Sequence, residues 1–290
     1  MMVTIANEHL TVIISSKGAE LQSIYNKQEQ LEYMWSGDAA FWGKKSPVLF
    51  PIIGTLKNDT YYFNDKTYQL GRHGFARDME FTVTEQTGSA VRFTVESNEV
   101  TLAKYPFAFR FEVKYELNGS SVKVTYSVSN TGKSAMYFSV GGHPAFKLPI
   151  AEGVNYNDYY LEFNQPEHAG RWPISKDGLI ETKPVDLLNN TDRLSLTKEL
   201  FEKDALVFKG LSSNSVTLKS DKNTHGLSFD FTGFPYLGVW AAKNADFVCI
   251  EPWCGIADSV NTDQQLVNKE GIHILQPAKN FERTWSVTMF

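Results

Sequence analysis

The chain has 290 residues, of which 42% are hydrophobic and 13% aromatic, so it can bury the core of one large β domain or of two ordinary domains. The formal net charge is −5 and no run of basic residues occurs, which argues against nucleic acid and anionic membrane surfaces as partners. No stretch approaches the roughly 18 apolar residues of a membrane span, and the N-terminus lacks the pattern of a signal peptide, so we expect a cytoplasmic protein.

Alternation of apolar and polar residues, which is typical of strands with one buried face, recurs along most of the chain. The predicted strands cover, in chain order, residues 11–15, 20–25, 91–95, 136–140, 215–218, 226–231, 236–241, 247–250 and 284–289. The clearest pattern predicts a hairpin over residues 107–129, in which two alternating runs flank the tight-turn pair Asn118-Gly119.

Helical patterns are few and short. Residues 192–196 lead into a predicted helix of two turns at 197–202, and a second short helix is predicted within 261–268. The longest stretch without a clear pattern, residues 149–196, is rich in Asn, Asp, Gly and Pro and is predicted to be an irregular functional rim. Many antiparallel strands and no shift in composition predict an all-β fold, with one large antiparallel β-sandwich domain over residues 1–290.

The first candidate functional residue is Glu251, in the segment Ile-Glu-Pro-Trp-Cys-Gly at 250–255. It follows an apolar run that reads as a buried strand, and Pro252 is expected to end that strand because proline has no N–H to donate. Poor solvation beside Trp253 would raise the pKa of the carboxyl group and make the carboxylate a better base. The alternative is a structural carboxylate held by backbone amides or an arginine.

Two histidines stand in glycine-containing segments. His143 lies between Gly142 and Pro144 in Gly-Gly-His-Pro-Ala-Phe, where it acts in proton transfer or caps a turn. His73 lies in Gly-Arg-His-Gly-Phe-Ala-Arg at 71–77, and the flanking arginines 72 and 77 would keep its imidazole neutral. A histidine in a basic loop is otherwise an ordinary surface residue.

Other chemistry has less support in the sequence. The spacing of Cys249 and Cys254 is not that of a redox or zinc pair, and none of the six histidines stands near another histidine or a carboxylate at a ligand spacing, so we expect no metal. The chain also lacks a glycine-rich phosphate loop and a nucleophile elbow. Asp204 or Asp230 remains open as the second carboxylate of a glycosidase-type pair.

Four motifs, in order, resemble the galactose mutarotase (aldose 1-epimerase) superfamily and its LacX-like branch. They are Phe-Pro-Ile-Ile-Gly at 50–54, His-Gly-Phe-Ala-Arg at 73–77, Gly-Gly-His-Pro-Ala-Phe at 141–146 and Ile-Glu-Pro-Trp at 250–253. The resemblance runs over nearly the whole chain. It implies a β-supersandwich fold and a cofactor-independent isomerase that interconverts the α and β anomers of an aldose such as galactose.

The resemblance also implies residue roles. The two family histidines fall on His73 and His143, and the family base falls on Glu251. In that scheme Glu251 removes the proton of the C1 hydroxyl, protonated His143 donates to the ring oxygen, and His73 holds the open form. A family aspartate that binds sugar hydroxyls is best matched by Asp204. Lys57 stands where mutarotases carry an arginine, and a lysine lacks the planar fork of a guanidinium.

Three hypotheses about the ligand remain open from the sequence. A free aldohexose would lie against an apolar wall, for which the candidates are Trp240, Trp253 and Phe234. A hexose 6-phosphate would bind through cations, and the candidates are Arg72, Arg77, Lys57 and Lys44. A non-catalytic sugar-binding module would use the same sandwich without an acid or a base. An accessory domain of a glycosidase or lyase is disfavoured because one domain fills the chain, and the sequence does not give the oligomeric state.

Overall fold

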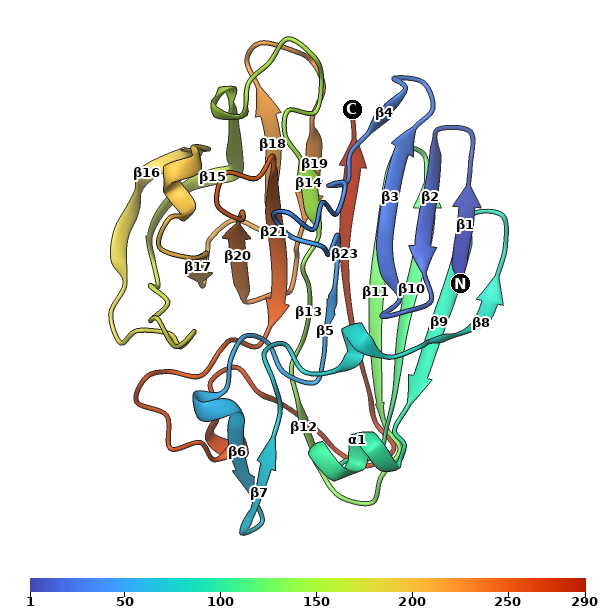
Figure 1. The fold of residues 1–290 in the computed structure, drawn as a ribbon, viewed down its shortest axis with the longest axis vertical. Helices are drawn as coiled ribbons and strands as arrows, with labels where there is room; N and C mark the ends of the chain where they lie inside the picture. Colours follow the sequence, from blue (N-terminus) through green and yellow to red (C-terminus); the bar gives the residue numbers. More distant parts are fainter.

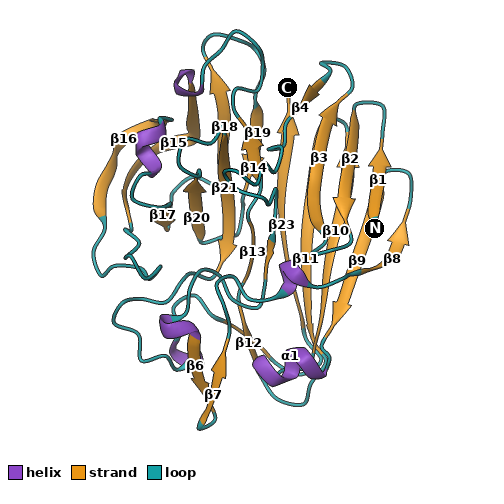
Figure 2. Ribbon diagram, viewed as in Figure 1, coloured by secondary structure: helices purple, strands orange, loops and turns teal.

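The protein is described by a computed structural model that covers residues 1–290. Strands dominate it and helices are few and short, as Figure 2 shows. The prediction of an all-β sandwich is therefore confirmed. A nine-stranded antiparallel sheet spans the molecule, and two smaller sheets lie side by side in front of it (Figure 1).

The nine-stranded sheet is built by alternating sequences such as the predicted hairpin, in which Leu117 pairs with Val122 and Phe111 with Val128. The inward side chains of this hairpin are buried because the second layer covers that face of the sheet. In spatial order its strands are β16 (Val185–Ser195), β15 (Tyr159–Arg171), β18 (Ser215–Ser220), β19 (Leu227–Asp230), β23 (Asn280–Met289), β11 (Ser121–Asn130), β10 (Phe109–Asn118), β9 (Ala90–Glu96) and β8 (Thr82–Gln86).

The covering layer consists of a four-stranded and a six-stranded sheet. The four-stranded sheet has the order β1 (Met2–Ala6), β2 (Leu10–Ser15), β3 (Glu20–Asn26), β4 (Leu31–Glu32). The six-stranded sheet has the order β17 (Leu206–Lys209), β20 (Tyr236–Trp240), β21 (Phe247–Cys254), β13 (Val140–Gly142), β5 (Val48–Leu49), and β14 (Ala145–Lys147) also pairs with β21. Aromatic contacts such as Phe146 with Phe229 and Phe163 with Phe208 join this layer to the large sheet.

Smaller elements close one end of the sandwich, at the bottom of Figure 1. They are the hairpin β6 (Thr60–Phe63) and β7 (Lys66–Gln69), the pair β12 (Met136–Phe138) and β22 (His273–Leu275), and the helix α1 (Glu99–Lys104). The short 3-10 helices are η1 (Lys57–Asp59), η2 (Ala76–Asp78), η3 (Tyr156–Asp158), η4 (Lys198–Phe201) and η5 (Leu266–Asn268). No helix has the length and apolar character needed to cross a membrane.

Four local predictions are wrong in whole or in part. Half of the stretch predicted as an irregular functional rim forms β15 and β16, whose bulged pairing hides the period-2 signal. Ile174, Gly178 and Ile180, from the irregular remainder, line a cavity. Residues 197–202, predicted as a helix of two turns, form only the short 3-10 helix η4, because residues 192–195 continue β16. Residues 261–268, predicted to hold a second short helix, contain only the 3-10 helix η5. Pro252 does not end β21, which runs on to Cys254.

The place of Pro252 in the sheet explains why the strand continues. The amide of Ile250 donates to the carbonyl of Pro144, and the backbone of residue 252 faces the same side because directions alternate along a strand. On that side β13 ends at Gly142 and β14 begins at Ala145. By the register, Pro252 lies opposite Gly142, the last residue of β13, so its missing N–H costs at most one ladder bond at the end of that pairing.

Candidate functional site

Three side chains from distant parts of the chain meet at the interruption between β13 and β14. His143 lies in it, Glu251 lies opposite on β21, and His73 comes from the loop between β7 and η2. All three line one cavity of about 240 Å³. The sequence predicted this convergence, and the cavity is of the size class that suits a small ligand such as one monosaccharide.

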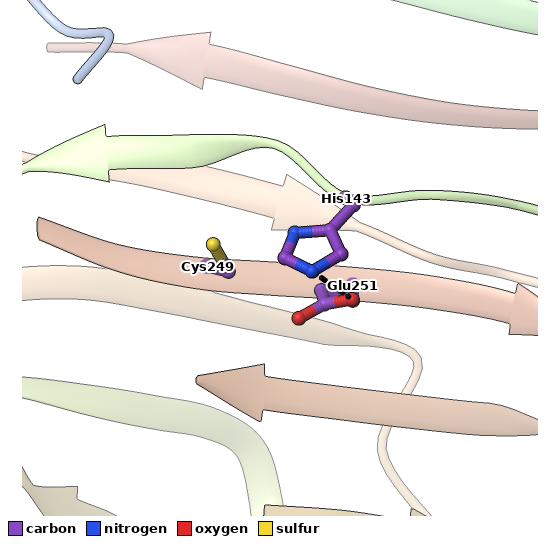
Figure 3. A group of neighbouring side chains, drawn as sticks. All are labelled: His143, Cys249 and Glu251. Atoms are coloured by element: carbon purple, nitrogen blue, oxygen red, sulfur yellow. Dashed lines mark ion pairs between the residues drawn. The ribbon is translucent and has the colours of Figure 1, made fainter. Parts of the chain in front are cut away.

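Glu251 and His143 form a buried pair (Figure 3). The distance from Nε2 of His143 to Oε2 of Glu251 is 3.2 Å, and the glutamate is 1% exposed. Oε2 of Glu251 has no hydrogen-bond partner, and neither does Nδ1 of His143. A buried oxygen without a partner is costly, and it is therefore ready to accept a hydrogen bond from a ligand.

Burial shifts the two pKa values of the pair in opposite directions. Desolvation raises the pKa of Glu251 well above its usual value, and Arg72 opposes this only in part. Desolvation, helped by Arg72 and Arg77, lowers the pKa of His143 to about 3. Both shifts favour the uncharged form of each group, so burial favours the state with one proton on the pair, and a free imidazolium beside a protonated glutamic acid is disfavoured.

A pH profile tests this single-proton state. As pH falls from 7 to 5, kcat/KM is expected to stay within about twofold, because a second proton adds only near the lowered pKa of His143. As pH rises through the raised pKa of Glu251, the pair loses its proton and kcat/KM declines. Initial rates of catalysed anomerisation, corrected for the spontaneous reaction, measure this. A fall in kcat/KM with an apparent pKa near 6.5, the ordinary value for histidine, would contradict the state in which the pair holds one proton.

His73 is fixed as a neutral donor by the backbone of Gly54. The amide of His73 donates to the carbonyl of Gly54 (2.9 Å), and the amide of Gly54 donates to Nδ1 of His73 (3.1 Å). Gly54 has a φ of +68°, and a Cβ there would lie 2.4 Å from Cβ of Ala257, so only glycine fits. Burial, and then His143 and the two arginines, lowers the pKa of His73, which leaves Nε2–H as its donor.

The imidazole of His143 is held by two tryptophans. Trp42 stacks on it with 4.9 Å between ring centroids and an angle of 28°, and Trp240 meets it edge-on at 5.6 Å. Both tryptophans line the cavity, as does Trp253. The sequence analysis missed Trp42, because the segment between β4 and β5 has no regular pattern; its aromatic pair Phe41-Trp42 is the one available signal.

Replacing Trp42 by alanine tests its contact with His143. Without the indole, water reaches the imidazole and its orientation is less fixed, so we expect kcat to fall about 10- to 10²-fold with a smaller change in KM. The same hydration raises the pKa of His143 towards 6.5 and moves the acid limb of the pH profile upwards. Trp42→Phe keeps a stacked ring and is expected to retain most of kcat. An unchanged pH profile in Trp42→Ala would contradict the effect of stacking.

Charged groups line the cavity opposite the pair. Nη2 of Arg72 lies 3.8 Å from Oδ2 of Asp204, and Nη2 of Arg77 donates to the carbonyl of Arg72 (2.8 Å). All three residues line the cavity, as expected for substrate-binding groups. Asp204 partly neutralises Arg72, and the partly exposed pair leaves room for both to contact hydroxyl groups.

Two residues predicted to bind substrate lie elsewhere. Lys57 does not line the cavity, because its Nζ donates to the carbonyl of Val260 (3.0 Å) and its amide donates to the carboxylate of Asp258. Phe234 is 6% exposed and packs in the main core instead of forming the apolar wall. Neither residue is a first candidate for contacting a ligand.

Two open alternatives are also decided by position. Lys44 pairs with Asp78 at 3.6 Å outside the cavity. Asp230 caps a turn through the amide of Thr232, so it lies outside the cavity and, of the two aspartates considered, only Asp204 lies in it. The site therefore offers one buried carboxyl–imidazole pair, one histidine with a free Nε2–H, and charged side chains of both signs.

The fold also gathers groups that the sequence did not bring together. A ring nitrogen of His143, a carboxylate oxygen of Glu251 and Sγ of Cys249 lie within 4.8 Å of one another. Spacing along the sequence did not reveal this grouping, because the three residues come together only through the pairing of distant strands.

The chain is similar to known proteins over almost all of its length. The family model described as aldose 1-epimerase matches residues 1–277. The chain belongs to the aldose 1-epimerase family. The chromosomal LacX protein of Lactococcus lactis subsp. lactis is 36% identical to it, over 100% of this chain and 99% of that protein.

Two solved structures of related proteins share the fold over their whole length. A galactose mutarotase related enzyme from Lactobacillus acidophilus is 38% identical, with a TM-score of 0.95 over 100% of this chain and 97% of that chain. A galactose mutarotase-like protein from Lactobacillus casei is 32% identical, with a TM-score of 0.93 over the whole of both chains. This aldose 1-epimerase family member therefore has a galactose mutarotase-like fold, and its family implies a mutarotase-type function on a sugar.

Proposed function

We propose that the protein interconverts the α and β anomers of a free aldohexose, with Glu251 as base and His143 as acid. The observation that carries the proposal is the buried pair with an unpartnered carboxylate oxygen, in a cavity lined by three tryptophans. A sugar ring presents apolar C–H faces to such a wall, and its hydroxyls would meet Asp204, Arg72 and Arg77.

In the proposed reaction the pair starts with its single proton on His143, which is the charged form that burial disfavours. Carboxylate Glu251 takes the proton of the C1 hydroxyl, imidazolium His143 gives its proton to the ring oxygen, and the C1–O5 bond breaks to leave an aldehyde. The pair is then neutral, which is the state that burial favours. Rotation about C1–C2 and reversal of both transfers give the other anomer, and no other reactant is consumed.

His73 would assist from the other side of His143. The two imidazole rings are 5.8 Å apart between centroids and nearly perpendicular. Since Nδ1 of His73 is occupied by the Gly54 amide, Nε2–H is free to donate to the ring oxygen or to a neighbouring hydroxyl. This contact would hold the open form until the ring closes, so that the aldehyde is not released.

Polarimetry of freshly dissolved α-glucose and α-galactose, with and without the protein, tests the proposal. We expect a rate increase proportional to protein concentration and the same equilibrium rotation. Saturable binding without any rate increase would favour a sugar-binding module instead. Galactose as the preferred sugar and a cytoplasmic location remain predictions, and a panel of free aldoses ranks the sugars.

A hexose 6-phosphate is the second candidate, favoured by the two arginines at the cavity. Lys57 and Lys44, the other expected phosphate partners, do not line it, and Arg72 already faces Asp204. We therefore expect the free sugar to be the better substrate. A 6-phosphate preferred by more than about tenfold in kcat/KM, which is about 1.4 kcal/mol, would reverse this choice.

A further inference from the structure

A buried thiol that the proposed reaction does not use lies beside the proton-transfer pair. Cys249 precedes Glu251 by two positions on β21, so both side chains project from the same face of the strand. Figure 3 shows both on the side where the imidazole of His143 lies. The thiol is free and fully buried, and Sγ lies within 4.8 Å of both the ring nitrogen and a carboxylate oxygen.

Thiolate, imidazole and carboxylate are the ligands that Zn²⁺ prefers in proteins. The 3.2 Å between Nε2 of His143 and Oε2 of Glu251 is close to the roughly 3.3 Å that separates two ligands at about 2.0 Å from one tetrahedral ion. Sγ needs to approach by on the order of 1 Å to reach a zinc–sulfur distance of about 2.3 Å, which small rotations of Cys249 and Glu251 supply.

We propose that Cys249, His143 and Glu251 form a binding site for Zn²⁺ and similar divalent transition-metal ions, and that the bound ion inhibits the protein reversibly. The fourth coordination position faces the cavity, which His143 and Glu251 both line. Inhibition rests on the proposed function, because the ion occupies the nitrogen and the oxygen that would exchange protons with the sugar.

Two observations besides the grouping point to a ligand. Oε2 of Glu251 is buried without a hydrogen-bond partner, so an ion would satisfy it. Asp204, which also lines the cavity, adds a negative charge that offsets part of the charge of Arg72 and Arg77. When the ion binds, the thiol proton and the proton of the pair both pass to the solvent, so binding strengthens as pH rises.

Cobalt provides a test that does not depend on activity. Purified protein is freed of metal with EDTA, the chelator is removed, and Co²⁺ is titrated at pH 8 while the absorption spectrum is recorded. We expect saturation with a thiolate-to-cobalt charge-transfer band and the strong visible bands of tetrahedral cobalt. Cys249→Ala is expected to lose the charge-transfer band and to bind at least about tenfold more weakly.

The second buried cysteine provides a matched control. Cys254 is also a free thiol on β21, but its Sγ faces the carbonyl of Gly233, away from the pair. Cys254→Ala removes the same thiol group and should keep both the band and the affinity. If Cys249→Ala does not fold, Cys249→Ser keeps the size of the side chain and also lacks the thiolate band.

The outcomes are separable. A wild-type titration without the thiolate band, or Cys249→Ala binding Co²⁺ as tightly as wild type, would overturn the site. Zn²⁺ is expected to slow catalysed anomerisation and EDTA to restore it; binding with the band but with unchanged rates would overturn the inhibition. If the wild-type protein catalyses no anomerisation, the proposed function fails, while the cobalt spectrum still decides the metal site.

Discussion

Replacing Glu251 by glutamine is expected to lower the rate of catalysed mutarotation by about 10²- to 10⁴-fold. Glutamine keeps the size of the side chain and the place in β21, but its amide cannot take a proton from the C1 hydroxyl. The loss should appear in kcat, with KM changed less, because the sugar still meets the tryptophans and the charged wall. Initial rates by polarimetry at several sugar concentrations measure both constants.

Two further variants show whether the effect belongs to the pair. His143→Asn removes the partner of Glu251 and is expected to cost a rate factor in the same range, while the fold persists. Glu167→Gln is the control: this glutamate is also buried, but it accepts hydrogen bonds from the amides of Ser212 and Ser213 outside the cavity. Full activity in Glu251→Gln or in His143→Asn would show that the roles are assigned wrongly.

Replacing Lys269 by methionine is expected to lower the free energy of unfolding by about 3–5 kcal/mol, the usual cost of leaving a buried charge without its partner. Nζ of Lys269 lies 2.8 Å from Oδ1 of Asp258, and both side chains are 3% exposed. Methionine fills nearly the same volume, so the loss comes from the unpaired carboxylate of Asp258 and not from a cavity. Chemical denaturation of both proteins measures the difference.

Lys269→Met is also expected to disturb the cavity, because hydrogen bonds to Asp258 hold backbone segments at and near it. Oδ2 of Asp258 accepts from the amide of Lys57, and the carbonyl of Asp258 accepts from the amide of Ile180, a cavity residue. Lys222→Met is the control, since Lys222 makes an equally short pair with Asp158 (2.7 Å) on the surface. In Lys222→Met, solvent takes the place of the lost lysine beside Asp158, so the free energy of unfolding of this variant should hardly change. Equal stability of wild type and Lys269→Met would contradict the cost of the buried charge.

Local patterns in the sequence predicted most of the strands, and its motifs pointed to the residues of the buried pair. The hairpin β10–β11 was predicted because alternation and the Asn118-Gly119 turn are encoded within about 20 neighbouring residues. Prediction failed where a strand lacks regular alternation, as in bulged β15 and β16, or where a neighbouring strand decides the outcome. Pro252 is the clearest example, because it stays in β21 opposite the end of the neighbouring strand β13.

The sequence by itself determined the all-β class, the family and the glycine-containing segments that carry His73, His143 and Glu251. Only the tertiary structure decided that Trp42 stacks on His143, that Cys249 lies beside the pair, and that Lys57 faces away from the cavity. The physical reason is that periodicity and turn chemistry act between neighbours in the chain. Burial, stacking and pKa shifts depend instead on which distant strands pair, and that is fixed by the packing of the whole sandwich.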